Sequence, residues 1–140
     1  MAKVNSSTEL PVAAQTVWSM IGNFNGLPDW HPAVEKSETS KEGGSKVRTL
    51  HLVGGGTIVE KLEAADDKAR TYSYSILSGP LPVANYTARL KVSEKEGGSG
   101  CTVEWSSEFD AAGAPESDAV AAIRGVYEAG FENLKKMFGG

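Results

Sequence analysis

Glu60 is the residue of this sequence whose type and neighbours best suit chemistry in a buried site. It alternates with Ile58 and Leu62, so on an extended strand the three side chains share one face, and we expect the carboxyl group to point inward. Burial raises the pKa of a carboxyl group, whereas a nearby cation such as Lys36 lowers it. A shifted carboxyl group in a cleft is a candidate acid, base or hydrogen-bonding partner of a ligand. A structural ion pair between Glu60 and Lys36 is the alternative.

Five ring side chains are further candidates. Tyr74 and Tyr86, with Tyr72 as a third candidate, could donate phenol hydroxyls to a carbonyl group of a ligand. His31 could transfer protons near neutral pH; alternatively, its ring only anchors the backbone of its loop. Trp30 either packs between a helix and the sheet or lines a pocket. The candidates for acid–base catalysis are Glu60, His31 and Tyr74.

Composition and charge exclude several classes of protein. The 140 residues include 14 basic and 18 acidic side chains, and a formal net charge of −4 provides no electrostatic footprint for nucleic acid. No apolar run approaches the roughly 18 to 20 residues of a membrane-spanning helix, and the N-terminus lacks the apolar middle of a signal peptide. We therefore expect a single domain, residues 1–140, that is cytoplasmic, binds no nucleic acid and makes no stable membrane insertion.

The sequence also lacks the patterns of metal and cofactor sites. The two histidines, His31 and His51, are far apart, and no spacing of histidine and cysteine resembles a zinc site. There is no GxGxxG, P-loop or nucleophile-elbow motif. The single cysteine, Cys101, cannot form an internal disulfide, which fits a reducing compartment. We expect neither a metal nor a cofactor.

The elements that must position these residues follow from hydrophobic periodicity and turn residues. A strand is predicted over 3–10, followed by a helix that opens at Pro11 and ends at Gly22 or Asn23, and then a short helical turn over 26–31. Apolar residues then alternate with polar ones between glycine-rich turns. Six strands are predicted, over 33–40, 46–53, 57–64, 70–77, 84–94 and 101–110. A long helix is predicted over 116–138, with Ser117 or Asp118 as its N-cap and Gly139 after its end.

The inner face predicted for this sheet is unusually polar. It carries tyrosines, Trp105, Glu60 and, on the side of Val34, Lys36. Phe109 belongs to the same face, and the long helix adds Tyr127 and Phe131 at helical spacing. Buried polar groups without partners cost about 1–3 kcal/mol each, whereas an apolar space with a few convergent polar groups is typical of a ligand cavity. Tyrosines at a wet rim around an otherwise dry core are the alternative.

The order of elements resembles the helix-grip fold of the START and pollen-allergen superfamily (SRPBCC), particularly its polyketide cyclase/dehydrase-like bacterial branch. The resemblance covers nearly the whole chain. It implies an α+β fold in which a curved, antiparallel, seven-stranded sheet wraps around a long C-terminal helix, with two short helices between the first and second strands. The motifs that carry it are Trp30-His31-Pro32, Glu60-Lys61-Leu62-Glu63 followed by Asp66-Asp67, and Gly79-Pro80-Leu81-Pro82 leading to Asn85-Tyr86.

A more distant resemblance is to the plant abscisic acid receptors. It implies that Lys36 meets a ligand carboxylate and that Glu60 and Asn85-Tyr86 also contact the ligand. Two loops depart from the receptors: Gly54-Gly55-Gly56 replaces their gate, and Leu81-Pro82-Val83 replaces their latch. Hormone sensing and phosphatase docking therefore do not carry over, although a cavity could.

The function expected from these observations is binding of a small, mostly hydrophobic molecule, such as a lipid, polyketide or isoprenoid-like metabolite, between the sheet and the C-terminal helix. A polyketide cyclase, aromatase or dehydratase that uses the same cavity is the alternative, and an interaction platform without a deep cavity is a third possibility. We expect a monomer or homodimer. The ligand contacts predicted are Trp30, Lys36, Glu60, Tyr72, Tyr74, Leu81, Tyr86, Trp105, Phe109, Tyr127 and Phe131.

Overall fold

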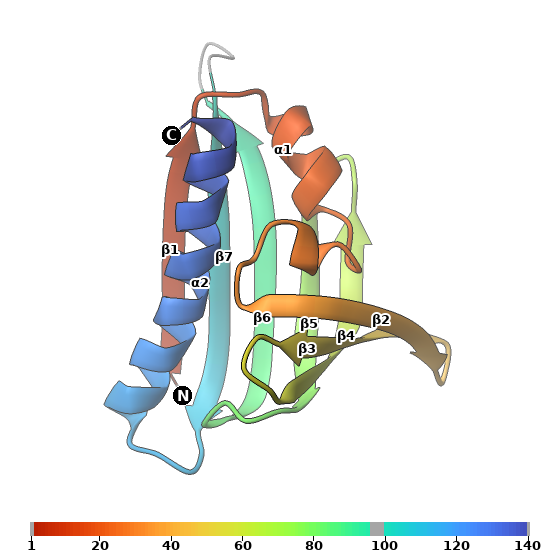
Figure 1. Cartoon of the computed structure of the whole chain (residues 1–140), viewed down its shortest axis with the longest axis vertical. Helices are drawn as coiled ribbons and strands as arrows, with labels where there is room; N and C mark the ends of the chain where they lie inside the picture. The colour runs from red at the N-terminus through yellow and green to blue at the C-terminus, as the bar shows by residue number, and fades with distance from the viewer. Residues whose placement is uncertain (1, 96–99, 140) are drawn as a thin grey trace.

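A single antiparallel sheet and one long helix dominate the fold. The computed structural model describes residues 2–95 and 100–139. Its seven strands are arranged in the order β1-β7-β6-β5-β4-β3-β2, and the helix α2 lies along β1 and β7 on one face (Figure 1). The predicted α+β helix-grip fold is therefore confirmed. The elements are β1 (Ala2–Leu10), α1 (Ala14–Ile21), the 3₁₀ turn η1 (Leu27–Asp29), β2 (Val34–Glu42), β3 (Ser45–Leu52), β4 (Thr57–Asp66), β5 (Thr71–Ser78), β6 (Val83–Glu94), β7 (Cys101–Ala111) and α2 (Glu116–Phe138).

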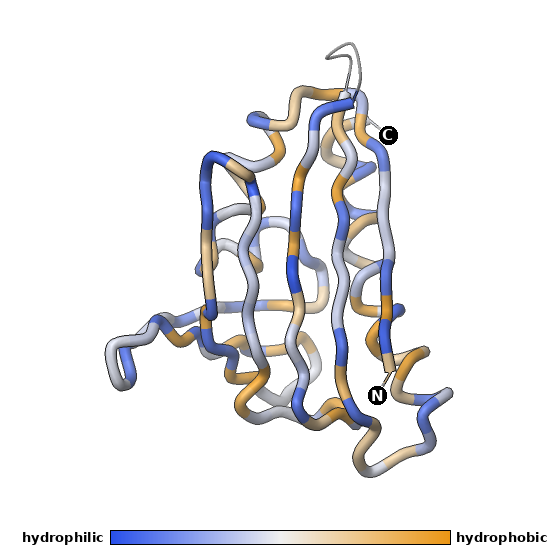
Figure 2. Tube along the Cα trace, turned by 180° about the vertical axis from the view of Figure 1, so that it is seen from behind, coloured by the Kyte–Doolittle hydropathy of each residue, from blue (hydrophilic) through white to orange (hydrophobic). Residues whose placement is uncertain are grey.

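The two faces of the sheet differ as the alternation predicted. Buried and more accessible residues alternate along β1 and β7, and Figure 2, which shows the sheet from behind, displays the corresponding alternation of hydropathy. Antiparallel sheets of this kind keep one face against the core and one in water. The core therefore lies between the inner face of the sheet, α2 and the short helices.

The start of the first helix and the N-cap of the second differ from the prediction. The first helix begins at Ala14, not at Pro11, because its first hydrogen bonds run from the amides of Thr16 and Val17 to the Ala13 carbonyl. At α2 the N-cap is Pro115, which has no capping side chain. The predicted caps Ser117 and Asp118 lie inside the first turn instead. Gly139 does end α2, in a left-handed conformation, as predicted.

The β2–β3 hairpin contains an irregularity that changes which residues face inward. Its turn uses Gly43 and Gly44, both at positive φ, as a tight two-residue hairpin requires. At the other end of the hairpin, Val34 lies opposite Leu52 and Lys36 lies opposite His51, with a bulge between them. Because the bulge inserts one residue, Lys36 does not share the face of Val34.

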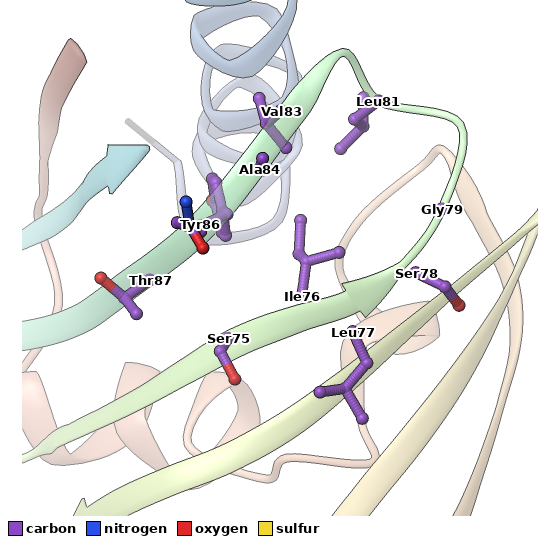
Figure 3. A pocket seen from close by; sticks show the side chains of 11 residues that line it. Ser75, Ile76, Leu77, Ser78, Gly79, Leu81, Val83, Ala84, Tyr86 and Thr87 are labelled. Atoms are coloured by element: carbon purple, nitrogen blue, oxygen red, sulfur yellow. The ribbon is translucent and has the colours of Figure 1, made fainter. Parts of the chain in front are cut away.

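The strands β5 and β6 separate before they reach their shared loop. They pair from Thr71 opposite Lys91 to Ser75 opposite Thr87, and β6 has an irregularity between Ala84 and Thr87. The result is an open hollow of about 600 Å³ between the end of β5 and the start of β6 (Figure 3).

Candidate functional site

A largely apolar cavity of about 330 Å³ lies between the inner face of the sheet and α2. Apolar atoms make up most of its wall, and the polar groups come from only a few side chains. Such a space, with a few convergent polar groups, has the character of a small-molecule site. Its lining residues are Leu27, His31, Ala33, Val34, Arg48, Leu50, Leu52, Ile58, Glu60, Tyr74, Ile76, Leu81, Tyr86, Trp105, Ala122, Ile123, Gly125, Val126 and Ala129.

The cavity exists because α2 presents small side chains to it. Ala122, Gly125 and Ala129 recur at steps of three and four residues along the helix, so they lie on one stripe. Gly125 is exposed, and a β-carbon added there would meet no atom within 4 Å. The side chains on the facing sheet do not fill the space above these small residues, so a cavity remains between the sheet and α2.

Three tyrosine hydroxyls form a hydrogen-bonded chain beside the cavity. The indole Nε1 of Trp105 donates to the Tyr74 hydroxyl at 3.0 Å, which lies 3.3 Å from the Tyr86 hydroxyl. The Tyr86 hydroxyl in turn bonds the Tyr127 hydroxyl, which α2 contributes. Burial raises the pKa of Tyr74, Tyr86 and Tyr127 well above the ordinary value, so all three remain protonated near neutral pH.

A buried ion pair between Arg48 and Glu60 forms the polar part of the opposite wall. The two residues face each other across β3 and β4 and are only 1% and 5% exposed. Arg48 donates from Nε to Glu60 Oε1 at 2.7 Å and from Nη1 to the Phe24 carbonyl at 2.6 Å. Its Nη2 lies 2.6 Å from the same carboxylate oxygen, and the guanidinium stacks 4.2 Å from the centre of the Phe24 ring.

The pair holds both charges inside the protein. Burial raises the pKa of Glu60, and the Arg48 guanidinium opposes that rise. For Arg48, burial alone would lower the pKa, but the Glu60 carboxylate and the neighbouring tyrosines hold it above its ordinary value. The sequence analysis gave Lys36 as the possible ion-pair partner of Glu60. The structure shows that the partner is Arg48 instead.

Lys36 is exposed and lies outside the cavity wall. The bulge after Val34 places it opposite His51, away from Leu52, which does line the cavity. The face that we predicted from strict alternation is wrong for this residue, because alternation does not continue through a bulge.

His31 lines the cavity, but both of its ring nitrogens bond the backbone. The Ala33 amide donates to Nδ1 at 3.2 Å, so Nε2 carries the proton and donates to the Val126 carbonyl of α2 at 2.7 Å. Burial lowers the pKa of this histidine, which keeps the ring neutral. The arrangement matches the alternative in which the His31 ring anchors the backbone of its loop. Asn133 of α2 also holds this loop, because its side-chain amide donates to the Trp30 carbonyl at 2.8 Å.

The structure divides the predicted contact residues into two groups. Five of them line the cavity: Glu60, Tyr74, Leu81, Tyr86 and Trp105. The others apart from Lys36 are buried in the core around it: Trp30, Tyr72, Phe109, Tyr127 and Phe131. Of these, Tyr127 joins the hydroxyl chain, whereas Tyr72 lies against Phe24 and interacts with Arg48.

Sequence reasoning missed Arg48, although a signal for it was present. Arg48 alternates with Leu50 and Leu52, just as Glu60 alternates with Ile58 and Leu62. Alternation alone therefore places Arg48 and Glu60 on the same face of the sheet. A hairpin centred on Gly55 would pair position 48 with position 62, whereas the observed hairpin is centred on Gly54 and pairs Arg48 with Glu60.

The open hollow between β5 and β6 shares part of its wall with the cavity. Ile76, Leu81 and Tyr86 line both spaces. In Figure 3, Ile76 lies between β5 and β6, with Leu81 on the loop that joins them. These side chains separate the cavity from the hollow.

Comparison with known proteins places the chain in a family. Residues 1–139 match the model of a family described as polyketide cyclase / dehydrase and lipid transport. The chain belongs to this family. The predicted polyketide cyclase-like branch is thus confirmed, whereas none of the curated proteins compared with the chain matches it.

Solved structures from bacteria share the fold of this family member. The protein XoxI from Bacillus cereus is 38% identical, with a TM-score of 0.93 over 99% of this chain and 96% of that chain. A putative uncharacterized protein from Bacillus thuringiensis is 37% identical, with a TM-score of 0.92 over 99% and 100%. An aromatase/cyclase from a Streptomyces species is 18% identical with a TM-score of 0.72 over 97% and 95%, which shows similarity of fold alone.

Two further observations concern the part of the chain that the structure describes. No helix there is long and apolar enough to cross a membrane. Within the same residues, no group of three or more histidine, cysteine, aspartate or glutamate side chains is arranged to hold a metal ion.

Proposed function

We propose that the protein binds one small, mostly apolar molecule in the cavity between the sheet and α2. The observation that carries this proposal is an apolar space of about 330 Å³ with polar groups at defined points of its wall. Ligand pockets range over about 300–1,000 Å³, so the ligand would be small. At about 30 Å³ for each water molecule of the liquid, the space corresponds to roughly ten waters.

The family description supports a hydrophobic ligand, because it includes lipid transport as well as cyclases and dehydratases. Lipid transport and polyketide chemistry both require an enclosed apolar space. The geometry favours binding over catalysis, because His31 is held by two backbone hydrogen bonds and Glu60 is held by Arg48.

Access to the cavity runs, in this proposal, past the loop over 79–83 and the loop over 54–56. The side chain of Leu81 borders both the cavity and the outer hollow, and no ladder pairs close the gap between β5 and β6 beyond Ser75 and Thr87. A displacement of Leu81 and Ile76 would join the two spaces.

A cavity-filling substitution tests the proposal. Ala122→Leu adds three carbon atoms at the cavity wall, whereas Ala121→Leu adds the same atoms at the exposed neighbouring position of the same helix. Overpacking costs about 1–3 kcal/mol, and 1.4 kcal/mol corresponds to tenfold in affinity. We therefore expect Ala122→Leu to weaken binding of ethylnaphthalene about tenfold, measured by NMR titration, and Ala121→Leu to leave it unchanged. Equal binding by both variants, or no saturable binding by the unmodified protein, contradicts the proposal.

A cyclase or dehydratase reaction is the second candidate, because Glu60 and Tyr74 both line the cavity. Such an enzyme would fold a polyketone and move a proton between a base and an acid. Incubation with a linear poly-β-ketone thioester, followed by mass spectrometry, would detect loss of water. This candidate requires turnover that falls in the Glu60→Gln and Tyr74→Phe variants. Turnover that survives Glu60→Gln and His31→Ala contradicts the acid–base version.

A further inference from the structure

We propose that the ligand is an uncharged molecule with a carbonyl-type oxygen, and that this oxygen accepts a hydrogen bond from the Tyr74–Tyr86 end of the hydroxyl chain. The inference rests on the proposed binding function and adds the chemical class of the ligand. Two observations carry it: the number of hydrogen atoms in the chain of hydroxyls, and the balance of charge around the cavity.

The hydroxyl chain contains one more hydrogen-bond donor than it can use. The Trp105 indole can only donate, and each of the three tyrosine hydroxyls carries one hydrogen atom. One plus three gives four hydrogen atoms, but only three hydrogen bonds join these four groups. Whichever way the bonds are oriented, one O–H has no acceptor within the chain.

The neighbouring hydroxyl group does not remove this surplus. A hydrogen bond with Ser107 contributes to the pKa of Tyr127. If Tyr127 donates that bond, the surplus passes to the Ser107 hydroxyl, which brings a hydrogen atom of its own. It is itself buried without an aligned partner among the described residues. A buried donor without an acceptor destabilises the folded protein, so the chain favours an acceptor that the protein does not supply.

The surplus O–H can be directed into the cavity at only one end of the chain. Tyr74 and Tyr86 line the cavity, whereas Tyr127 does not. If Tyr127 donates to Tyr86 and Tyr86 donates to Tyr74, the Tyr74 oxygen accepts two hydrogen bonds and its O–H is free. Hydrogen bonds in such a chain strengthen one another, which makes this hydroxyl a good donor to a ligand oxygen.

The charges at the cavity balance without a ligand. Arg48 and Glu60 compensate each other at 2.6 Å, and the neutral tautomer of His31 is held by backbone hydrogen bonds. Lys36, which would have paired with a ligand carboxylate, is exposed on the other face. A carboxylate in the cavity would therefore be an uncompensated buried charge, which is costly.

Three probes of similar shape separate the possibilities: methyl naphthyl ketone, ethylnaphthalene and naphthoate, each substituted at the same ring position. The net contribution of one hydrogen bond predicts that the ketone binds about 2- to 13-fold more tightly than the hydrocarbon in an NMR titration. Naphthoate should bind most weakly. Equal binding of ketone and hydrocarbon overturns this inference but leaves the proposed function standing. Tightest binding of naphthoate overturns the uncharged class, and no binding of any probe overturns both proposals.

Phenylalanine substitutions locate the donor. Removing one cavity-lining hydroxyl leaves the other able to donate, so Tyr86→Phe should keep the preference for the ketone. The double variant Tyr74→Phe/Tyr86→Phe should bind ketone and hydrocarbon equally. Tyr72→Phe, which removes a buried hydroxyl outside the chain and the cavity wall, is the matched control and should keep the preference. A ketone preference that persists in the double variant overturns the assignment.

An infrared measurement on the unmodified protein avoids any question of folding. The carbonyl stretch of bound methyl naphthyl ketone, labelled with carbon-13, should lie at lower frequency than in a hydrocarbon solvent, because a donated O–H weakens the C=O bond. A band at the hydrocarbon-solvent position contradicts the inference.

Discussion

The two sides of α2 differ in what they present to the rest of the protein. We call Tyr127, Gly130 and Leu134 its packed side, because all three are buried and none lines the cavity. Ala122, Gly125, Val126 and Ala129 form its cavity side. On the packed side, the Tyr127 ring stacks 4.3 Å from the ring of Trp105. On the cavity side, the small residues leave space, and we propose that a ligand binds there.

This difference shows how one helix can stabilise the fold and also leave space for the ligand that we propose. The packed side must fit its neighbours closely: a β-carbon at Gly130 would lie 2.9 Å from atoms of both His31 and Trp30. The cavity side has no such constraint at Gly125. Close packing stabilises the fold, whereas the unfilled stripe forgoes packing contacts and keeps room for a ligand.

The hydroxyl chain joins Tyr127 on the packed side of α2 to Tyr74 and Tyr86 in the sheet wall of the cavity, and alkaline pH should disrupt both the packing and the cavity. Burial raises the pKa of Tyr72, Tyr74, Tyr86 and Tyr127 above the ordinary value of 10.0. Above that pH the unfolded chain loses protons that the folded chain keeps, so the free energy of unfolding falls as pH rises. We expect tyrosinate absorbance to appear only together with loss of the circular dichroism of the fold. An ordinary tyrosine titration in a protein that stays folded would contradict this account of the chain.

The Arg48–Glu60 pair should matter to stability as much as an apolar residue of the packed side. Arg48→Met leaves a carboxylate buried without its partner, which typically costs about 3–5 kcal/mol. Urea unfolding measures the loss. The double variant Arg48→Met/Glu60→Met should recover most of it, because replacing both members of a buried pair by apolar side chains is often neutral. A loss under about 1 kcal/mol in Arg48→Met, the range of exposed pairs, would show that water reaches Glu60.

The two glycines of α2 give the sharpest test of the difference between its sides. Replacing an interior helical glycine by alanine ordinarily stabilises a protein by about 0.5–1 kcal/mol, and we expect this gain for Gly125→Ala. Gly130→Ala should instead destabilise the protein by about 1–3 kcal/mol, the usual effect of overpacking. Thermal unfolding of the pair measures both changes, and effects of the same sign would mean that the two sides do not differ as described.

Much of the fold was predictable because period-two alternation and glycine turns locate strands without knowledge of their partners. The long helix over 116–138 was predicted from apolar residues at helical spacing and agrees with α2. Strand alternation predicted that Glu60 and the tyrosines of the sheet lie on the inner face, and they are buried. These features depend on local pattern, which a sequence contains in full.

The features that the sequence analysis did not predict depend on register and packing. The bulge in β2 turned Lys36 outward, and no local signal marks an inserted residue. Arg48 was overlooked because a charged residue is normally assigned to the solvent face, although its alternation with Leu50 and Leu52 placed it on the inner face. Its pairing with Glu60 depends on the register of the hairpin, which is centred on Gly54. That Tyr127 approaches Tyr86 depends on how α2 packs on the sheet, which strand periodicity does not determine.

Native mass spectrometry of the protein purified from the cells that naturally make it tests the central claim most directly. The account predicts a protein that carries one small apolar molecule, released on denaturation, with a carbonyl oxygen and no carboxylate. A protein that arrives empty and fails to bind any of the naphthalene probes would contradict the claim that the cavity is a binding site.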